Sequence, residues 1–101
     1  MKHQKLLTVM GFAAKAGAII SGETGCLSAI KKNRACLLII AEDAAESTRT
    51  SFQSNAAQKQ LPVITGATKD EMGRAIGKSP RSILVIIKKD FARQIDDLLS
   101  T

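Results

Sequence analysis

Few side chains in this sequence have the type and spacing that catalysis requires. The chain has one histidine, His3, close to its start. The sequence therefore offers neither a His-based catalytic triad nor a cluster with the spacing of zinc ligands. Cys26 and Cys36 lie in apolar stretches and are interpreted as small buried hydrophobic residues rather than a disulfide. We therefore expect no enzymatic activity, no catalytic residue, no metal and no cofactor.

Two other patterns invite a ligand site, and each has a simpler interpretation. Gly22 and Gly25 open a predicted helix, but the lysine and hydroxyl pair that completes a nucleotide-binding loop is missing. Glu42 and Asp43 follow an apolar strand, where open α/β sheets often bind ligands. Asp43 is better explained as a helix cap and Glu42 as its solvated neighbour.

The net charge favours a polyanionic partner. Fifteen Lys and Arg against nine Asp and Glu give a charge of +6, and such a surplus attracts polyanions. From the charge alone, binding to nucleic acid and the absence of any specific anionic partner are about equally expected. The chain has no Trp or Tyr, and of its three Phe we assign Phe52 and Phe91 to the core. We therefore expect no stacking platform for single-stranded bases, and any RNA binding would depend on backbone charge and shape.

Helical and strand patterns alternate along the whole chain. Helices show apolar residues at a spacing of three and four, and the two longest apolar runs do not alternate, as in strands covered on both faces. The predicted order is a helix from 2 that ends at 17, a strand at 18–20, a helix at 23–32, a strand at 36–41, a helix at 44–59, a strand at 62–65, a helix at 68–77, a strand at 82–87 and a helix from 90. This order predicts an α/β fold with a sheet between helical layers.

Capping residues predict where several helices begin. Asp43 with Glu46, and Thr68 with Glu71, have the spacing of capping boxes. Asp90 is predicted to cap the last helix.

The length and the hydrophobic pattern limit the number of domains and the possible membrane-spanning segments. A length of 101 residues suits one compact domain, so 1–101 is interpreted as a single domain. No apolar run approaches the roughly 20 residues that cross a bilayer, and the start of the chain does not resemble a signal peptide. We expect a cytoplasmic protein that does not bind membranes.

Two ordered segments resemble a known family. They are Gly22-Glu23-Thr24-Gly25-Cys26-Leu27-Ser28-Ala29-Ile30, continued by Ala35, Leu37 to Ala41 and Asp43-Ala44, and then Met72-Gly73-Arg74-Ala75-Ile76-Gly77. They are similar to the kink-turn-binding ribosomal proteins of the L-seven-Ae type, and the resemblance covers essentially the whole domain. The stretches Gly11-Phe12-Ala13-Ala14-Lys15-Ala16-Gly17 and Ser21-Gly22-Glu23 are most similar to the bacterial YlxQ-like branch.

The resemblance implies a three-layer α-β-α sandwich with a four-stranded mixed sheet, and a non-enzymatic, ribosomal-protein-like function. It implies binding to kinked or bent structured RNA, such as a kink-turn, and not to DNA, with the ribosome and translation factors as further candidate partners. The second helix would present its N-terminus to the RNA, together with the loop before the last strand. The implied RNA-binding residues are Gly22, Glu23, Thr24, Gly25, Ser28, Lys31, Lys32, Lys78, Ser79, Pro80 and Arg81.

Physical chemistry supports a role for this helix. Its N-terminus offers free N–H groups and a partial positive charge to phosphates. Thr24, Ser28 and then Lys31 or Lys32 follow at helical spacing, on a face predicted to lie opposite Leu27 and Ile30. The simpler alternative is that these polar residues are only solvated.

The sequence departs from the family pattern at the predicted contact. The family commonly has asparagine, glutamate and lysine where this chain has Thr24, Gly25 and Ser28, and losing a charged donor at a base edge removes about 1 to 3 kcal/mol of discrimination. The last loop, apolar in the family, reads Lys78-Ser79-Pro80-Arg81 and suits phosphate.

Two hypotheses follow for the surface of the molecule. The first is a single basic surface made by Lys15, Arg34, Arg74, Lys78 and Arg81. The second, kept open by the departures, is that the chain is a protein-interaction module of the translation machinery that has lost specific RNA recognition.

Overall fold

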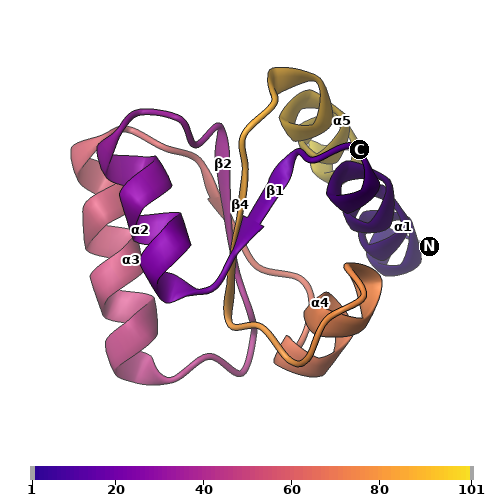
Figure 1. The fold of residues 1–101 in the computed structure, drawn as a ribbon, viewed down its shortest axis with the longest axis horizontal. Coiled ribbons are helices and arrows are strands. Elements are labelled where there is room, and N and C mark those ends of the chain that lie inside the picture. Colours follow the sequence, from indigo (N-terminus) through magenta and orange to yellow (C-terminus); the bar gives the residue numbers. More distant parts are fainter. Residues whose placement is uncertain (1, 101) are drawn as a thin grey trace.

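The structure is a computed structural model that describes residues 2–100 (Figure 1). Helices and strands alternate in the predicted order. Their bounds are α1 (Lys2–Lys15), β1 (Ile19–Ser21), α2 (Glu23–Lys31), β2 (Leu37–Ile40), α3 (Glu46–Gln58), β3 (Val63–Ile64), α4 (Lys69–Ala75), β4 (Ile83–Ile86) and α5 (Lys89–Ser100).

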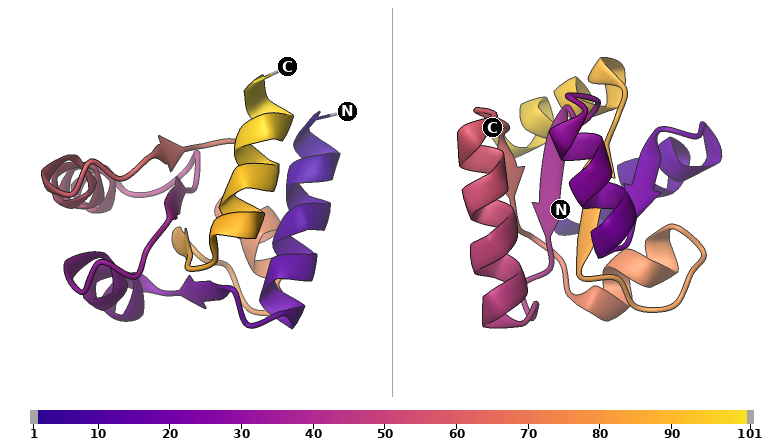
Figure 2. Two further views of the ribbon diagram at one scale, coloured as in Figure 1. Left: turned by 90° about the horizontal axis from the view of Figure 1, so that it is seen from above. Right: turned by 60° about the vertical axis from the view of Figure 1, so that its left-hand side comes forward.

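The four strands form one mixed sheet in the order β1-β4-β2-β3. β4 runs antiparallel to both β1 and β2, whereas β3 runs parallel to β2. α2 and α3 cover one face, and α1, α4 and α5 cover the other (Figures 1 and 2). The predicted three-layer α-β-α sandwich with a four-stranded mixed sheet is confirmed.

The two inner strands are fully buried, and their alternating side chains supply two cores. Leu37 and Ile39 of β2 pack toward α1, α4 and α5, whereas Leu38 and Ile40 pack toward α2 and α3. Helices on both faces therefore explain the unbroken apolar runs of β2 and β4. Cys26 belongs to the second core, where burial raises the pKa of its thiol to about 12. Both cysteines are free, but the prediction that both are buried holds for Cys26 alone, because Cys36 is half-buried.

Two of the predicted helix caps are wrong, and one is confirmed. α3 begins at Glu46 after Ala45, which makes no side-chain capping bond, because Asp43 accepts the N–H of Lys69 at the start of α4 instead, at 2.8 Å. α5 begins at Lys89, so Asp90 lies inside its first turn. Thr68 does cap α4: its side chain accepts the backbone N–H of Glu71, and the Glu71 side chain accepts the backbone N–H of Thr68, which makes a capping box.

The strand register divides the connections between two ends of the sheet. Ile86, the last residue of β4, pairs with the first residues of β1 and β2, Ile19 and Leu37. One end, at the top of Figure 1, therefore carries the connections 15–18, 31–36, 59–62 and 87–89, and we call it the upper end. The opposite, lower end carries 21–23, 41–46, 65–69 and 76–82.

Candidate functional site

The turn from β1 into α2 leaves the start of α2 without a side-chain cap. Gly22 is the N-cap, with φ 88°, a left-handed conformation that favours glycine. The first N–H groups of a helix have no partner within the helix, and no side chain of the turn accepts them here. The backbone of Glu23, Thr24 and Gly25 therefore offers donors and the positive end of the helix dipole at the lower end.

Arg81 joins this turn to the loop before β4. Its Nε donates to Ser21 Oγ at 3.3 Å, and one terminal nitrogen donates to Ser79 Oγ at 2.7 Å and to the carbonyl oxygens of Ser79 and Pro80. The guanidinium thus holds two segments that are sixty residues apart in the sequence. Gly22 to Gly25 and Lys78 to Arg81 are therefore brought to one side of the molecule.

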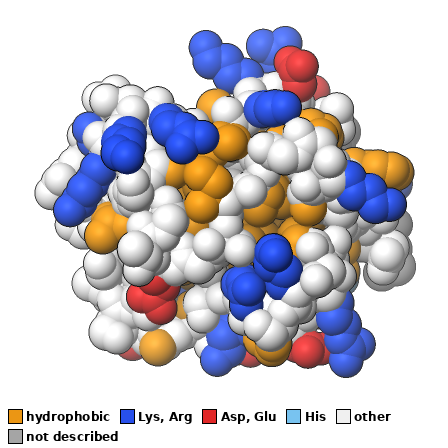
Figure 3. Space-filling view, viewed as in Figure 1, with side chains coloured by type: hydrophobic (Ala, Val, Ile, Leu, Met, Phe, Trp, Pro, Cys, Tyr) orange, Lys and Arg blue, Asp and Glu red, His pale blue; other side chains and the backbone are white. Residues whose placement is uncertain are grey.

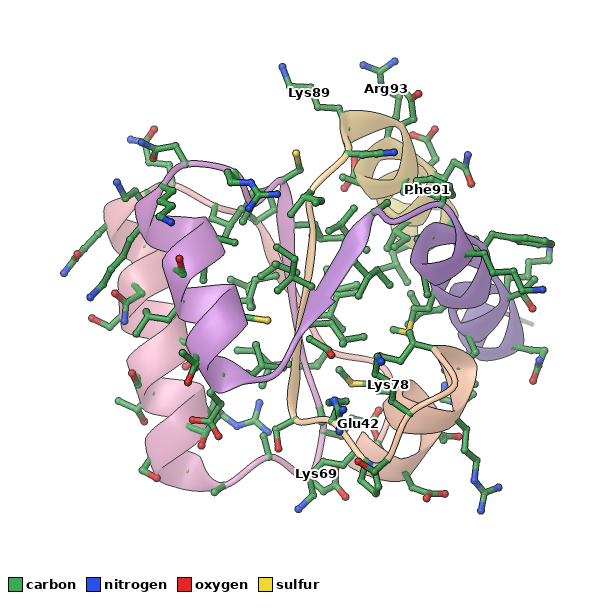
Figure 4. All side chains as sticks on the ribbon, in the orientation of Figure 1. Glu42, Lys69, Lys78, Lys89, Phe91 and Arg93 are labelled. Carbon is green, nitrogen blue, oxygen red and sulfur yellow. The ribbon has the colours of Figure 1, made fainter. Side chains whose placement is uncertain are left out.

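The same loop is packed closely on α4. A Cβ atom on Gly73 would stand 2.3 Å from the carbonyl oxygen of Ser79, so only glycine allows this approach. The N–H of Lys78 donates to the Gly73 carbonyl at 2.8 Å, and that of Arg81 to the Lys69 carbonyl at 3.1 Å. Lys78, Ser79 and Pro80 are exposed on this anchored loop, where Figure 4 labels Lys78 beside α4.

Arg49 organises the neighbouring connection between β2 and α3. Its guanidinium donates to the carbonyl oxygens of Ala41 and Glu42, at 3.2 and 2.9 Å. The side chains of Glu42 and Lys69 lie at the bottom of the view in Figure 4. Sequence reasoning missed Arg49, because no local pattern indicates a bond from a helix back to the preceding loop.

The outer face of α2 is confirmed as a polar surface, with one correction. Thr24, Ser28, Lys31 and Lys32 line a shallow hollow of about 370 Å³, and Leu27 lines it with them. The correction concerns Leu27, which was predicted to face inward. It is half-buried and packs against the second core, but it also borders the hollow on the outer face.

The predicted site residues do not all gather in one place. Lys32 follows Thr24 by eight residues, which puts it about 12 Å further along the helix at a rise of 1.5 Å per residue. Lys31 and Lys32 therefore belong to the upper end, although they share a face with Thr24.

The residues predicted to form a single basic surface are divided over the molecule. Arg34 lies at the upper end, and Lys78 and Arg81 lie at the lower end. Lys15 and Arg74 line one groove between α1 and the end of α4. Arg74 pairs with Asp70 on α4, at 3.0 Å. Sequence spacing could not reveal this division, because it depends on the strand order of the sheet.

An exposed aromatic side chain lies on α1, beside a groove that reaches the end of α4. Phe12 is 61% exposed beside a groove of about 530 Å³ between α1 and the end of α4, also lined by Leu7, Gly11, Ala75 and Ile76. Phe52 is buried and Phe91 half-buried, as assigned to the core. Sequence reasoning left Phe12 without a role.

Two negative findings apply to residues 2–100. No cluster of three or more His, Cys, Asp or Glu is placed to hold a metal ion within this range. Within the same range, every helix is too short or too polar to cross a membrane.

A model of the ribosomal protein L7Ae/L30e/S12e/Gadd45 family matches residues 4–95. The chain is 28% identical over 97 residues to an Enterococcus faecium protein named RNA-binding protein YlxQ, covering 96% of this chain and 93% of that protein. It is 26% identical over 99 residues to a protein of the same name from Bacillus subtilis, covering 98% and 99%.

Solved structures share the fold. A protein of unknown function from Bacillus halodurans superposes with a TM-score of 0.91 at 28% identity, covering 96% of this chain and 98% of that one. A Giardia lamblia 15.5 kD RNA-binding protein superposes with a TM-score of 0.82 at 23% identity, covering 98% and 85%. The second likeness concerns the fold alone.

Proposed function

The chain belongs to the ribosomal protein L7Ae/L30e/S12e/Gadd45 family, and we propose that it binds kinked or bent structured RNA and has no enzymatic activity. The proposed contact is at the lower end, where the start of α2 lies beside the loop from Lys78 to Arg81. Two relatives that align over nearly their full length are named RNA-binding proteins, which supports RNA as the ligand.

The observation that carries this proposal is the bond between Arg81 and Ser21. It sets an uncapped helix N-terminus and a basic loop side by side. Each can bind a phosphate group, and two backbone segments come close together where an RNA is sharply bent. Arg81 acts in this proposal mainly as a positioning residue, because its guanidinium is already committed to the loop.

The side chains of α2 would add contacts beyond the backbone. The hydroxyl groups of Thr24 and Ser28 can donate to or accept from base edges and 2′-hydroxyls. Glu23 is exposed at the same turn, and the connections of the lower end carry four carboxylates against three cations. Non-specific attraction to phosphates is therefore weak at this end, and recognition would depend on the shape of the RNA.

The test is a titration with a kink-turn RNA and with a matched straight duplex that lacks the bulge. We expect tighter binding to the kink-turn at physiological salt, and weaker binding at raised salt because phosphate contacts release counterions. Lys78→Gln should weaken kink-turn binding several-fold, whereas the matched control Lys5→Gln on α1 should not. Equal, weak binding of both RNAs would count against the proposal.

The groove at Phe12 supports a second candidate, a protein-interaction module associated with the translation machinery. Protein interfaces are enriched in aromatic residues, and the exposed Phe12 stands beside a mostly apolar groove between α1 and the end of α4. Purified translation factors, tested one at a time, would then bind the wild type and not Phe12→Ser. Lys78→Gln should leave that binding unchanged, which separates the two functions.

A further inference from the structure

The positive charge of the chain is concentrated at the end opposite to the proposed RNA contact. The four connections of the upper end carry seven cations and no carboxylate, whereas those of the lower end carry three cations and four carboxylates. The upper-end cations are Lys15, Lys31, Lys32, Arg34, Lys59, Lys88 and Lys89. The carboxylate nearest to them in the sequence is Asp90.

These seven side chains are exposed and not ion-paired. The ion pairs between His3 and Glu71 and between Arg74 and Asp70 involve none of these seven residues. Lys88 donates one hydrogen bond, to the Ala16 carbonyl at 3.1 Å. Figure 3 shows blue side chains along the top and upper left of the molecule, while most of the red ones in that view lie toward the bottom.

Helix stability accounts for only part of this cluster. α1, α2 and α3 end here, and a cation near each C-terminus compensates the helix dipole. Lys88 and Lys89, however, stand at the start of α5, where the dipole already carries positive charge. Arg34 lies beyond the last turn of α2. Lys88 also donates to the Ala16 carbonyl just beyond the C-terminus of α1, which compensates its charge. Lys89 and Arg34 are therefore the cations for which no helix C-terminus accounts, and an anion would offset their charge.

We infer that the upper end is a second RNA-binding surface, which holds the phosphate backbone of an RNA helix without reading its sequence. Six of its seven cations are lysines, which act as flexible point charges on phosphates, and it presents no aromatic side chain among the four connections. Protein interfaces are depleted in Lys and enriched in aromatic residues, so the composition favours RNA over a protein partner.

The outer face of α2 connects the two surfaces. Thr24 and Ser28 begin it at the lower end, and Lys31 and Lys32 end it at the upper end, all along one hollow. An RNA bent at the lower end could continue along this face to the upper end. The inference goes beyond the proposed recognition of bent RNA, because a straight duplex should also bind the upper end.

The test compares two double variants that remove the same charge from different places. Arg34→Gln with Lys59→Gln changes the upper end, and Lys5→Gln with Arg74→Gln changes exposed cations of α1 and α4 outside it. Each is titrated with a straight RNA duplex and with the kink-turn RNA over a range of salt concentrations, after thermal unfolding has shown that it is folded.

We expect the upper-end variant to bind the straight duplex about tenfold more weakly and to lower the salt slope by about two, one for each lost phosphate contact. The control variant should change the affinity by less than about twofold. The ratio of kink-turn to duplex affinity should stay as in the wild type, because that ratio reports the lower end.

Three outcomes would overturn the inference. They are an unchanged duplex affinity and salt slope in the upper-end variant, an equal loss in the control variant, and binding of polyglutamate to the wild type as tightly as the duplex, which would favour an acidic protein partner. A lost preference for the kink-turn with an intact effect of the upper-end variant would instead reject the proposed function alone.

Discussion

At the scale of single residues, His3 links the start of α1 to α4. Its Nδ1 lies 2.7 Å from the Gly66 carbonyl oxygen and its Nε2 lies 2.8 Å from Glu71 Oε2. Both contacts are donated together only by the protonated imidazolium, because a neutral ring has one N–H. The hydrogen bond to Glu71, followed by that to Gly66, raises the pKa of His3. The backbone N–H of Thr68, followed by His3, lowers the pKa of Glu71.

These shifts predict a pH-dependent contribution of His3 to stability. A raised pKa means that the folded state favours the charged ring, so the stabilisation is full below the unfolded value of 6.5 and disappears as the pH rises through the folded pKa. It also declines at acid pH, as the pH falls through the lowered pKa of Glu71. Thermal unfolding of the wild type and His3→Gln should therefore differ most between these two pKa values and converge at alkaline pH. A difference in stability that does not vary with pH would show that the charged form of His3 does not stabilise the fold.

Gly73 predicts a steric test of the loop before β4. Gly73→Ala places a methyl group 2.3 Å from the Ser79 carbonyl oxygen, a backbone atom, so the loop must move. Overpacking of this kind costs about 1 to 3 kcal/mol, measured by urea unfolding, and we expect weaker kink-turn binding as well.

The matched control for this test is Gly77→Ala. Gly77 has φ 75° and open space around it, so alanine there brings strain of about 1 kcal/mol without pushing the loop. Kink-turn affinity should therefore fall in Gly73→Ala and stay close to that of the wild type in Gly77→Ala. The opposite order would show that loop position does not matter for binding.

Residue types indicated the candidate site, but not the bonds that assemble it. Gly22 was predictable, because a tight strand-to-helix turn favours glycine. The bond from Arg81 to Ser21 joins residues sixty apart, and its formation depends on the pairing of β1 with β4. The exposure of Phe12 likewise depends on how α4 packs on α1.

At the scale of elements, hydrophobic periodicity predicted every helix and strand, whereas their ends depended on tertiary contacts. The local pair of Thr68 and Glu71 forms its capping box, with bonds of 3.2 and 2.9 Å, because both partners belong to the same turn. Asp43 had an equally good local pattern with Glu46. Its carboxylate nevertheless bonds to Lys69, since the connections after β2 and β3 lie side by side at the lower end.

This exchange of caps predicts which helix depends on Asp43. Asp43→Ala should destabilise the protein by about 1 kcal/mol, the usual effect of losing a carboxylate acceptor at a helix start. The loss should appear as faster amide hydrogen exchange in α4 and not in α3. The control Glu46→Ala, in the first turn of α3, should cost about 0.5 kcal/mol at most. Faster exchange confined to α3 would show that Asp43 caps that helix in solution.

At the scale of the whole molecule, the sheet topology separates the charges. Lys15, Arg34 and Lys59 come from three distant parts of the sequence and all lie at the upper end, because β1, β2 and β3 all begin there. The total charge was known from composition, but its distribution required the strand order.

The clustering of seven cations predicts that salt stabilises the free protein. Their mutual repulsion acts over about 30 Å at 0.01 M salt and only about 8 Å at 0.15 M, so the melting temperature should rise as sodium chloride is added. Arg34→Gln with Lys59→Gln should relieve about 0.5 kcal/mol of repulsion at low salt. For a domain of this size, that corresponds to a rise of about 2 to 4 °C in Tm, which should vanish at high salt. The control Lys5→Gln with Arg74→Gln should show no such gain, because Arg74 loses its pair with Asp70. If the two variants respond to salt alike, the repulsion is not localised at the upper end.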